Sequence, residues 1–192
     1  NAVHGAINVI SPDPLGEDLT RLQLGAGAFD RYSGTAELRR RGIYAALHGY
    51  SDGGYRADSG VDQLKAQLAY GWSRGNSSVT TRASFHHLEQ ETAGFVQGQD
   101  AFRDDDLRRT NPNPDAFRDL SHFVISSEVV HRTDEGSLTV TPYAIASDMT
   151  FRLHFLPSQA IEETRHVAVG ALSSWQRTLG PDTELLAGID LE

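Results

Sequence analysis

A serine near the end of the first quarter of the chain lies in a possible catalytic motif. Gly49-Tyr50-Ser51-Asp52-Gly53 matches the G-x-S-x-G nucleophile elbow, in which a strand ends at the serine and a helix follows, exposing the hydroxyl beside backbone N–H donors. Residues 43–49 fit the strand, and the apolar spacing of residues 59–72 also fits a helix. The rest of the chain lacks the strand and helix alternation of a hydrolase sheet. We therefore assign no catalytic residue and expect a protein that is not an enzyme, with a secreted serine hydrolase as one alternative.

Histidine offers a second kind of chemistry. His86 and His87 are adjacent, and neighbouring residues of a strand point to opposite faces, so the two imidazoles cannot bind one metal ion without distortion. His86 would share a face with Arg82 and Ser84, where an imidazole is able to contact an iron complex, heme or another metal chelate. The spacing of the eight histidines predicts no closed metal site, and we assign neither a metal nor a cofactor.

Residues 90–119 contain a run of charged side chains that points to ligand binding. Asp100 and the triplet 104–106 precede Arg108 and Arg109. Carboxylates bind calcium, and guanidinium groups bind anions through paired hydrogen bonds. Calcium, an anionic chelate and a solvated loop without any ligand are therefore the three interpretations of this segment. Asn111-Pro112-Asn113-Pro114 restricts the backbone, and long loops of this kind commonly display binding residues.

The composition limits the class of protein. The 192 residues include 17 Lys and Arg against 26 Asp and Glu, for a net charge of −9. Because phosphate binding needs basic residues gathered on one face, and those here are scattered, we expect no nucleic-acid partner. No stretch approaches the ~18 consecutive apolar residues of a membrane-spanning helix. The chain has no cysteine, which excludes disulfides and thiolate metal sites.

The elements that must position these residues are predicted to be strands. Apolar residues alternate with polar or small ones over residues 20–28, 61–73 and 167–175, which is the period of a strand with one apolar face. Short links that contain the Gly, Asn or Asp of tight hairpins occur at 40–42, 74–77, 133–136 and 179–182. Longer links lie between them, at about 52–60, 90–119 and 149–164. An antiparallel sheet with its short turns at one end and its long loops at the other is typical of an outer-membrane barrel.

Aromatic residues fall near the predicted strand ends. Tyr70, Trp72 and Trp175 precede short links, while Phe85 and Phe123 flank the longest loop. These positions fit the two aromatic girdles of a transmembrane barrel. They also fit the core of a soluble β-sandwich binding module, which stays an alternative.

The first residues resemble a known family. Asn1-Ala2-Val3-His4-Gly5-Ala6-Ile7-Asn8-Val9-Ile10 resembles the segment that closes the plug domain of TonB-dependent outer-membrane receptors, and residues 51–56, 91–94 and 187–192 resemble recurrent barrel segments of that family. The resemblance implies an all-β fold, an antiparallel transmembrane β-barrel of about 22 strands whose lumen is filled by the plug. Residues 1–13 would end the plug domain, and residues 14–192 would form about nine N-terminal strands of the barrel. We therefore expect a fragment that lacks the TonB box, most of the plug and the later strands.

The same resemblance implies a function. It is energy-coupled uptake of a scarce solute across the bacterial outer membrane, above all a ferric siderophore or a similar metal chelate, and less often cobalamin, heme or a glycan. The implied partners are this solute, the TonB complex through the missing N-terminal segment, and outer-membrane lipid. A passive porin would share the strand pattern without the plug-closing segment and stays an alternative. The candidate ligand contacts, chosen as outer-rim groups able to meet an anionic or aromatic chelate, are Tyr55, Arg56, His86, Arg103, Arg108 and Arg109.

Overall fold

A computed structural model describes residues 11–152, 158, 160–180 and 182–192. The segment 1–10, which carries the resemblance to a plug ending, lies outside the described residues, as does His154. The predicted boundary between a plug and a barrel domain therefore stays a prediction.

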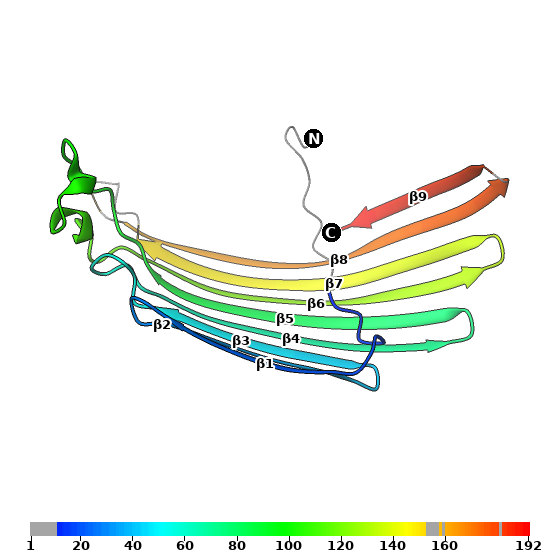
Figure 1. Ribbon diagram of the computed structural model, residues 1–192. Coiled ribbons are helices and arrows are strands. Elements are labelled where there is room, and N and C mark those ends of the chain that lie inside the picture. Colours follow the sequence, from blue (N-terminus) through cyan, green and yellow to red (C-terminus); the bar gives the residue numbers. More distant parts are fainter. Residues whose placement is uncertain (1–10, 153–157, 159, 181) are drawn as a thin grey trace.

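The described chain forms one antiparallel sheet of nine strands (Figure 1). The strands are β1 (Leu19–Gly27), β2 (Arg31–Arg40), β3 (Ile43–Asp52), β4 (Val61–Arg74), β5 (Ser77–Glu91), β6 (Phe117–Thr133), β7 (Gly136–Arg152), β8 (Ile161–Gly180) and β9 (Thr183–Leu191). Each strand pairs with its neighbours in sequence, and β1 and β9 form the two edges, so the sheet is not closed. Two short 3-10 turns, η1 (Ala101–Arg103) and η2 (Leu107–Arg109), lie in the link between β5 and β6. The predicted all-β class and the predicted nine strands are confirmed.

Residues 61–74 form a strand and not a helix. The helical interpretation of residues 59–72 is wrong, because β4 is extended through Val61–Arg74 and pairs along its length with β5. The period-two pattern of β4 places most of its apolar residues on one face of the sheet and most of its polar residues on the other. The helical spacing of Val61, Leu64 and Leu68 does not correspond to a helix. Ser51 is therefore followed by a loop and a strand, and the helix that a nucleophile elbow requires is not formed there.

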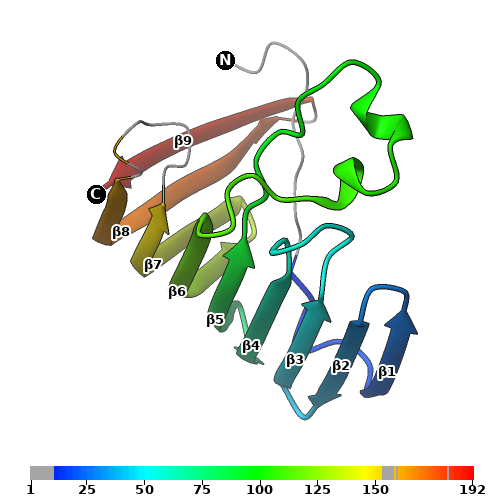
Figure 2. The same ribbon diagram turned by 90° about the vertical axis from the view of Figure 1, so that its left-hand side faces the viewer.

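The two ends of the sheet differ in the length of their links, as predicted. The links β2–β3, β4–β5, β6–β7 and β8–β9 are short and gather at the right in Figure 1, which we call the turn end. The links β3–β4, β5–β6 and β7–β8 are longer and belong to the opposite end, which we call the loop end. In Figure 2 the longest link, between β5 and β6, projects to the concave side of the sheet.

One turn at the loop end is an exception that the sequence did not reveal. β1 and β2 are joined only by residues 28–30, and the register closes the hairpin at Gly27 and Arg31. Phe29 and Asp30 both have left-handed backbone angles, with φ of 63° and 53°. Aspartate is enriched in that conformation, but phenylalanine is not. The turn was missed because a glycine, its usual signal, is absent from residues 28–30.

The convex face of the sheet is apolar and exposed. A row of residues in direct register crosses eight strands on this face, and it consists of Leu22, Ala36, Leu47, Ala66, Phe85, Phe123, Ala146 and Val167. Large members of this face are open to the surroundings: Leu22 is 71% exposed and Val167 is 72% exposed. The aromatic residues Tyr70, Trp72 and Trp175 are likewise exposed on it.

The concave face is more polar and carries the chain segment that precedes β1. The polar side chains that share this face include Arg21, Gln23, Gln63, Lys65, Gln67, Arg82, Glu128 and Arg132. Pro14 packs against the backbone at Gly71 on β4 and is fully buried. Tyr44 and Ala69, which are paired neighbours close to this segment, are among the few buried residues of the sheet.

In the part of the chain that the structure describes, no helix is long and apolar enough to cross a membrane.

Candidate functional site

Two loops at the loop end are joined by hydrogen bonds to backbone carbonyl oxygens. The Ala57 N–H donates to the Arg109 carbonyl oxygen over 2.9 Å. The Arg56 guanidinium donates twice to the Thr110 carbonyl oxygen, at 2.9 Å from Nε and 2.7 Å from Nη2. The Asn111 amide nitrogen donates to the Asp58 carbonyl oxygen over 2.8 Å. The link β3–β4 and the link β5–β6 therefore form one structural unit, although more than fifty residues separate the bonded positions.

Tyr55 lies at the centre of this unit. The guanidinium carbons of Arg108 and Arg109 lie 5.9 and 5.6 Å from the centroid of the Tyr55 ring, within the range of cation–π attraction. The Phe29 ring meets the Tyr55 ring edge to face, with centroids 5.4 Å apart. This contact gives a reason for the left-handed backbone at Phe29, since it directs the ring toward Tyr55. We call Phe29, Tyr55, Arg56, Arg108 and Arg109 the loop cluster.

Asp52 fixes the start of the loop that carries Tyr55. Its carboxylate accepts hydrogen bonds from the Gly54 N–H at 2.9 Å, the Tyr50 hydroxyl at 2.8 Å and Arg31 Nε at 2.8 Å. The Gly54 N–H, then the Tyr50 hydroxyl and Arg31, hold the pKa of the Asp52 carboxyl below its usual value. The same ion pair raises the pKa of Arg31. Asp52 therefore stays ionised at neutral pH and anchors both the loop and the hairpin β2–β3.

The aspartates of the β5–β6 link are used mainly inside the loop. The Asp104 carboxylate accepts the N–H groups of Asp106 and Leu107, at 3.1 and 2.9 Å, and so forms the turn before η2. Asp105 pairs with Arg108. Across the described residues, no three His, Asp or Glu side chains are placed so that they could hold a metal ion. The calcium interpretation of this segment thus gains no support from the geometry.

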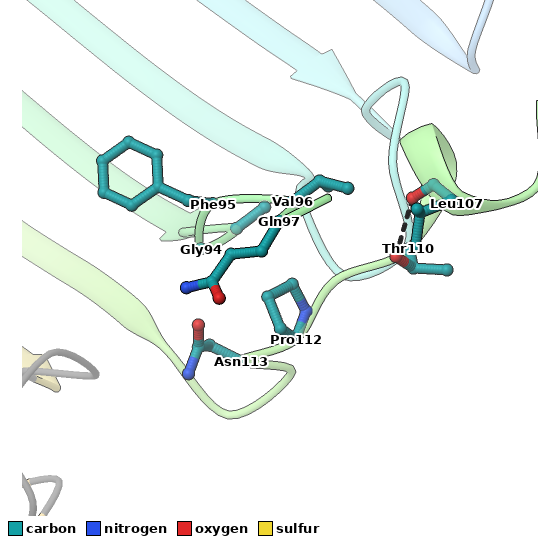
Figure 3. A pocket seen from close by; sticks show the side chains of 9 residues that line it. Gly94, Phe95, Val96, Gln97, Leu107, Thr110, Pro112 and Asn113 are labelled. Carbon is teal, nitrogen blue, oxygen red and sulfur yellow. Dashed lines mark hydrogen bonds between the residues drawn. The ribbon is translucent and has the colours of Figure 1, made fainter. Parts of the chain in front are cut away.

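A pocket of about 860 Å³ opens beside the loop cluster, within the β5–β6 link (Figure 3). It is lined by Ala93, Gly94, Phe95, Val96, Gln97, Leu107, Thr110, Pro112 and Asn113. Its walls are mostly apolar, and the amides of Gln97 and Asn113 face one another across it in Figure 3. Such a mixture of apolar walls and a few polar groups is typical of small-molecule sites.

Of the six predicted contacts, four come together and two do not. Tyr55, Arg56, Arg108 and Arg109 all belong to the loop cluster. Arg103 lies instead over the ring of its neighbour Phe102, 5.2 Å from the centroid. His86 is on β5, on the concave face of the sheet.

A row of histidines on that face was not predicted from the sequence. Direct cross-strand register joins Gln23, Thr35, His48, Lys65, His86, His122, Ser147 and His166. Four of the eight histidines of the chain therefore share one row. Counting residues from each hairpin turn would have aligned them, but that needs the turn positions to be known without error.

Comparison of the chain with protein-family models, with curated proteins and with solved structures finds no match. The function of the chain must therefore be inferred from the geometry of its own residues.

Proposed function

We propose that this chain is part of the barrel wall of a TonB-dependent outer-membrane receptor. The receptor takes up a scarce solute, a ferric siderophore or a similar metal chelate, across the bacterial outer membrane with energy supplied through TonB. Residues 14–192 form N-terminal strands of the barrel, and residues 1–13 end the plug.

The observation that carries this proposal is the contrast between the two faces of the sheet. The convex face presents a continuous apolar row across eight strands, with Leu22 and Val167 more than two thirds exposed. In water such a surface is an aggregation hazard, because contiguous apolar patches of this extent are uncommon on soluble monomers. Against lipid the same surface is favourable, and a polar concave face suits the interior of a wide barrel.

The segment that precedes β1 favours a receptor over an open porin. Pro14 and its neighbours pack on the concave face, against Gly71 and close to Tyr44. A chain that enters the sheet from its concave side is the connection that a plug inside the barrel needs.

The loop cluster supplies the chemistry for capture. Tyr55 offers an aromatic face, and Arg108 and Arg109 offer guanidinium donors for a carboxylate or hydroxamate-type oxygen. Arg108 Nε is enclosed and has no hydrogen-bond partner among the described residues, so a ligand oxygen would satisfy it.

Uptake by whole cells tests the proposal. The complete parent gene is expressed in a strain that lacks its own ferric receptors, and uptake of radioactive iron is measured for a panel of siderophores. We expect uptake that a protonophore or a tonB deletion abolishes. The double variant Arg108→Ala/Arg109→Ala should lower ligand affinity by roughly tenfold or more, because each charge-assisted hydrogen bond contributes about 1.5–3 kcal/mol.

Arg103→Ala is the matched control, since Arg103 lies in the same loop but outside the loop cluster. Its affinity should equal that of the wild type. Uptake that persists with the protonophore and without TonB would instead identify a passive pore.

A further inference from the structure

The concave face carries a transverse row of imidazoles below the loop cluster. His86 on β5 and His122 on β6 are direct register partners, and Lys65 on β4 is the partner of His86 on its other side. His48 and His166 continue the row outward. Directly paired residues on one face have Cβ atoms ~5 Å apart, so the imidazoles of His86 and His122 can reach a single metal ion between them.

The central pair lies between two apolar rows. Leu88, Leu120 and Met149 are in register on the side toward the loop end. Val124 and Ile145 are in register on the side toward the turn end. His86 and His122 are themselves half-buried. Water competes less strongly for a ligand at a polar pair enclosed in this way than at an exposed pair.

His86 lacks a hydrogen bond that its position requires. Its Nε2 atom is enclosed, and no partner for it exists among the described residues. Buried polar atoms are nearly always satisfied, and a bound water or ion supplies the partner where the protein does not. By contrast, the neighbouring His48 is oriented by Thr35, whose hydroxyl lies 2.8 Å from His48 Nδ1.

The positive charge of Lys65 favours binding of a metal chelate over binding of a free metal ion. Lys65 is the register partner of His86, and its positive charge opposes a free divalent cation but attracts a metal held in an anionic chelator. Imidazole is a preferred ligand of nickel, copper and zinc. Binding through imidazole also requires coordination positions on the metal that the chelator leaves to exchangeable water.

We propose that His86 and His122 bind the metal ion of an anionic, incompletely coordinated chelate of a divalent transition metal, with Lys65 balancing its charge. The place of this site on a transport route rests on the proposed function. The site lies on the concave face, on the turn-end side of the loop cluster. Among metal chelates it selects those of a divalent metal with open coordination positions, and not ferric siderophores that occupy every position on the iron.

Two nickel chelates of known coordination test the site. The full-length protein is purified in detergent micelles and titrated calorimetrically with nickel nitrilotriacetate, an anion that leaves positions open, and with nickel ethylenediaminetetraacetate, an anion that leaves none. We expect binding of the first and none of the second. Equal binding of both would overturn the proposal, because the saturated chelate cannot accept imidazole.

Variants locate the site. His86→Ala and His122→Ala should each weaken binding of nickel nitrilotriacetate by roughly tenfold or more, since even the loss of an outer partner of a metal ligand costs about that much. His131→Ala is the control, because His131 lies on the convex face, where its Nδ1 contacts Ser77. Wild-type affinity in His86→Ala, or an equal loss in His131→Ala, would overturn the proposal.

The charge of Lys65 gives an independent readout. Lys65→Gln should weaken binding of nickel nitrilotriacetate by roughly threefold to tenfold and strengthen binding of free nickel ion. The opposite signs would overturn the assignment to an anionic chelate. These titrations need no transport, so failure of TonB-dependent uptake with intact binding would refute the proposed function and leave the metal site standing.

Discussion

Asp52 is the residue on which the position of the loop cluster most depends. Three donors converge on its carboxylate, from β2, from β3 and from the loop that follows. We expect Asp52→Asn to release residues 53–60, because the amide cannot accept all three bonds as an ionised carboxylate does. Amide exchange at Gly54 and Tyr55 should accelerate by roughly tenfold, which hydrogen exchange measures directly. Asp62→Asn, on the convex face of β4, should leave exchange in this loop unchanged.

The lowered pKa of Asp52 also sets a pH dependence. Because the folded pKa lies below the ordinary value of 3.8, the carboxylate stabilises the loop fully above pH 3.8. This contribution is lost as the pH falls through the folded pKa. Loop protection in the wild type should therefore be constant near neutrality and decline only in strong acid, while in Asp52→Asn it should be low throughout. A decline in the wild type between pH 5 and 7 would show that another group controls the loop.

At the scale of elements, the contact between β4 and the segment before β1 admits a direct test. A Cβ atom placed on Gly71 would lie 2.8 Å from Pro14 Cγ and 3.1 Å from Leu15 Cγ. Gly71→Ala should therefore push this segment off the concave face, at a cost of about 1–3 kcal/mol in the free energy of unfolding. Limited proteolysis should then cleave within residues 11–18 faster than in the wild type.

Gly49→Ala is the control for that variant. Gly49 lies on the neighbouring strand β3, and nothing stands within 4 Å of an added Cβ there. Its unfolding free energy should stay close to that of the wild type. If both variants resist protease equally well, the packing of Pro14 does not hold the segment in place.

Strand order was predictable from sequence because local signals specify it. The alternation in residues 61–73 and the Gly, Asn and Asp of the short links place β4 and the turn-end hairpins without any tertiary information. The β1–β2 turn was not predictable, since Phe29 takes a left-handed backbone for the sake of a contact with Tyr55. The loop cluster and the histidine row depend on pairings between distant segments, which side-chain patterns along one strand do not report.

At the scale of the whole molecule, the two faces of the sheet differ in polarity. Its concave face carries Arg, Lys, Gln and His side chains together with the segment before β1, while its convex face carries the exposed leucines, valines and aromatics. Loop length follows the other axis, with the loop cluster at one end and tight turns at the opposite end. The proposed barrel wall, with water and a plug on one side and lipid on the other, would require both asymmetries together.

A charge placed on either face of β4 should reveal which side meets lipid. Leu68 lies near the middle of β4 on the convex face and is 55% exposed, whereas its neighbour Gln67 points to the concave face and is also exposed. Leu68→Arg should lower the free energy of unfolding in bilayers by about 2–4 kcal/mol and reduce the amount assembled in the outer membrane, because the guanidinium would enter the hydrocarbon layer. Gln67→Arg should change neither quantity much, since in the proposed barrel its side chain faces a hydrated lumen.

The two variants distinguish a membrane protein from a soluble one, because in a soluble protein the exposed position of Leu68 predicts little loss of stability in Leu68→Arg. In water, arginine at an open apolar position such as Leu68 costs little and often improves solubility. Equal stability of Leu68→Arg and Gln67→Arg in bilayers, with equal assembly, would therefore mean that the convex face is not a lipid surface. That result would contradict the proposed barrel and therefore the proposed receptor. The loop cluster and the histidine row would then be features of a soluble sheet.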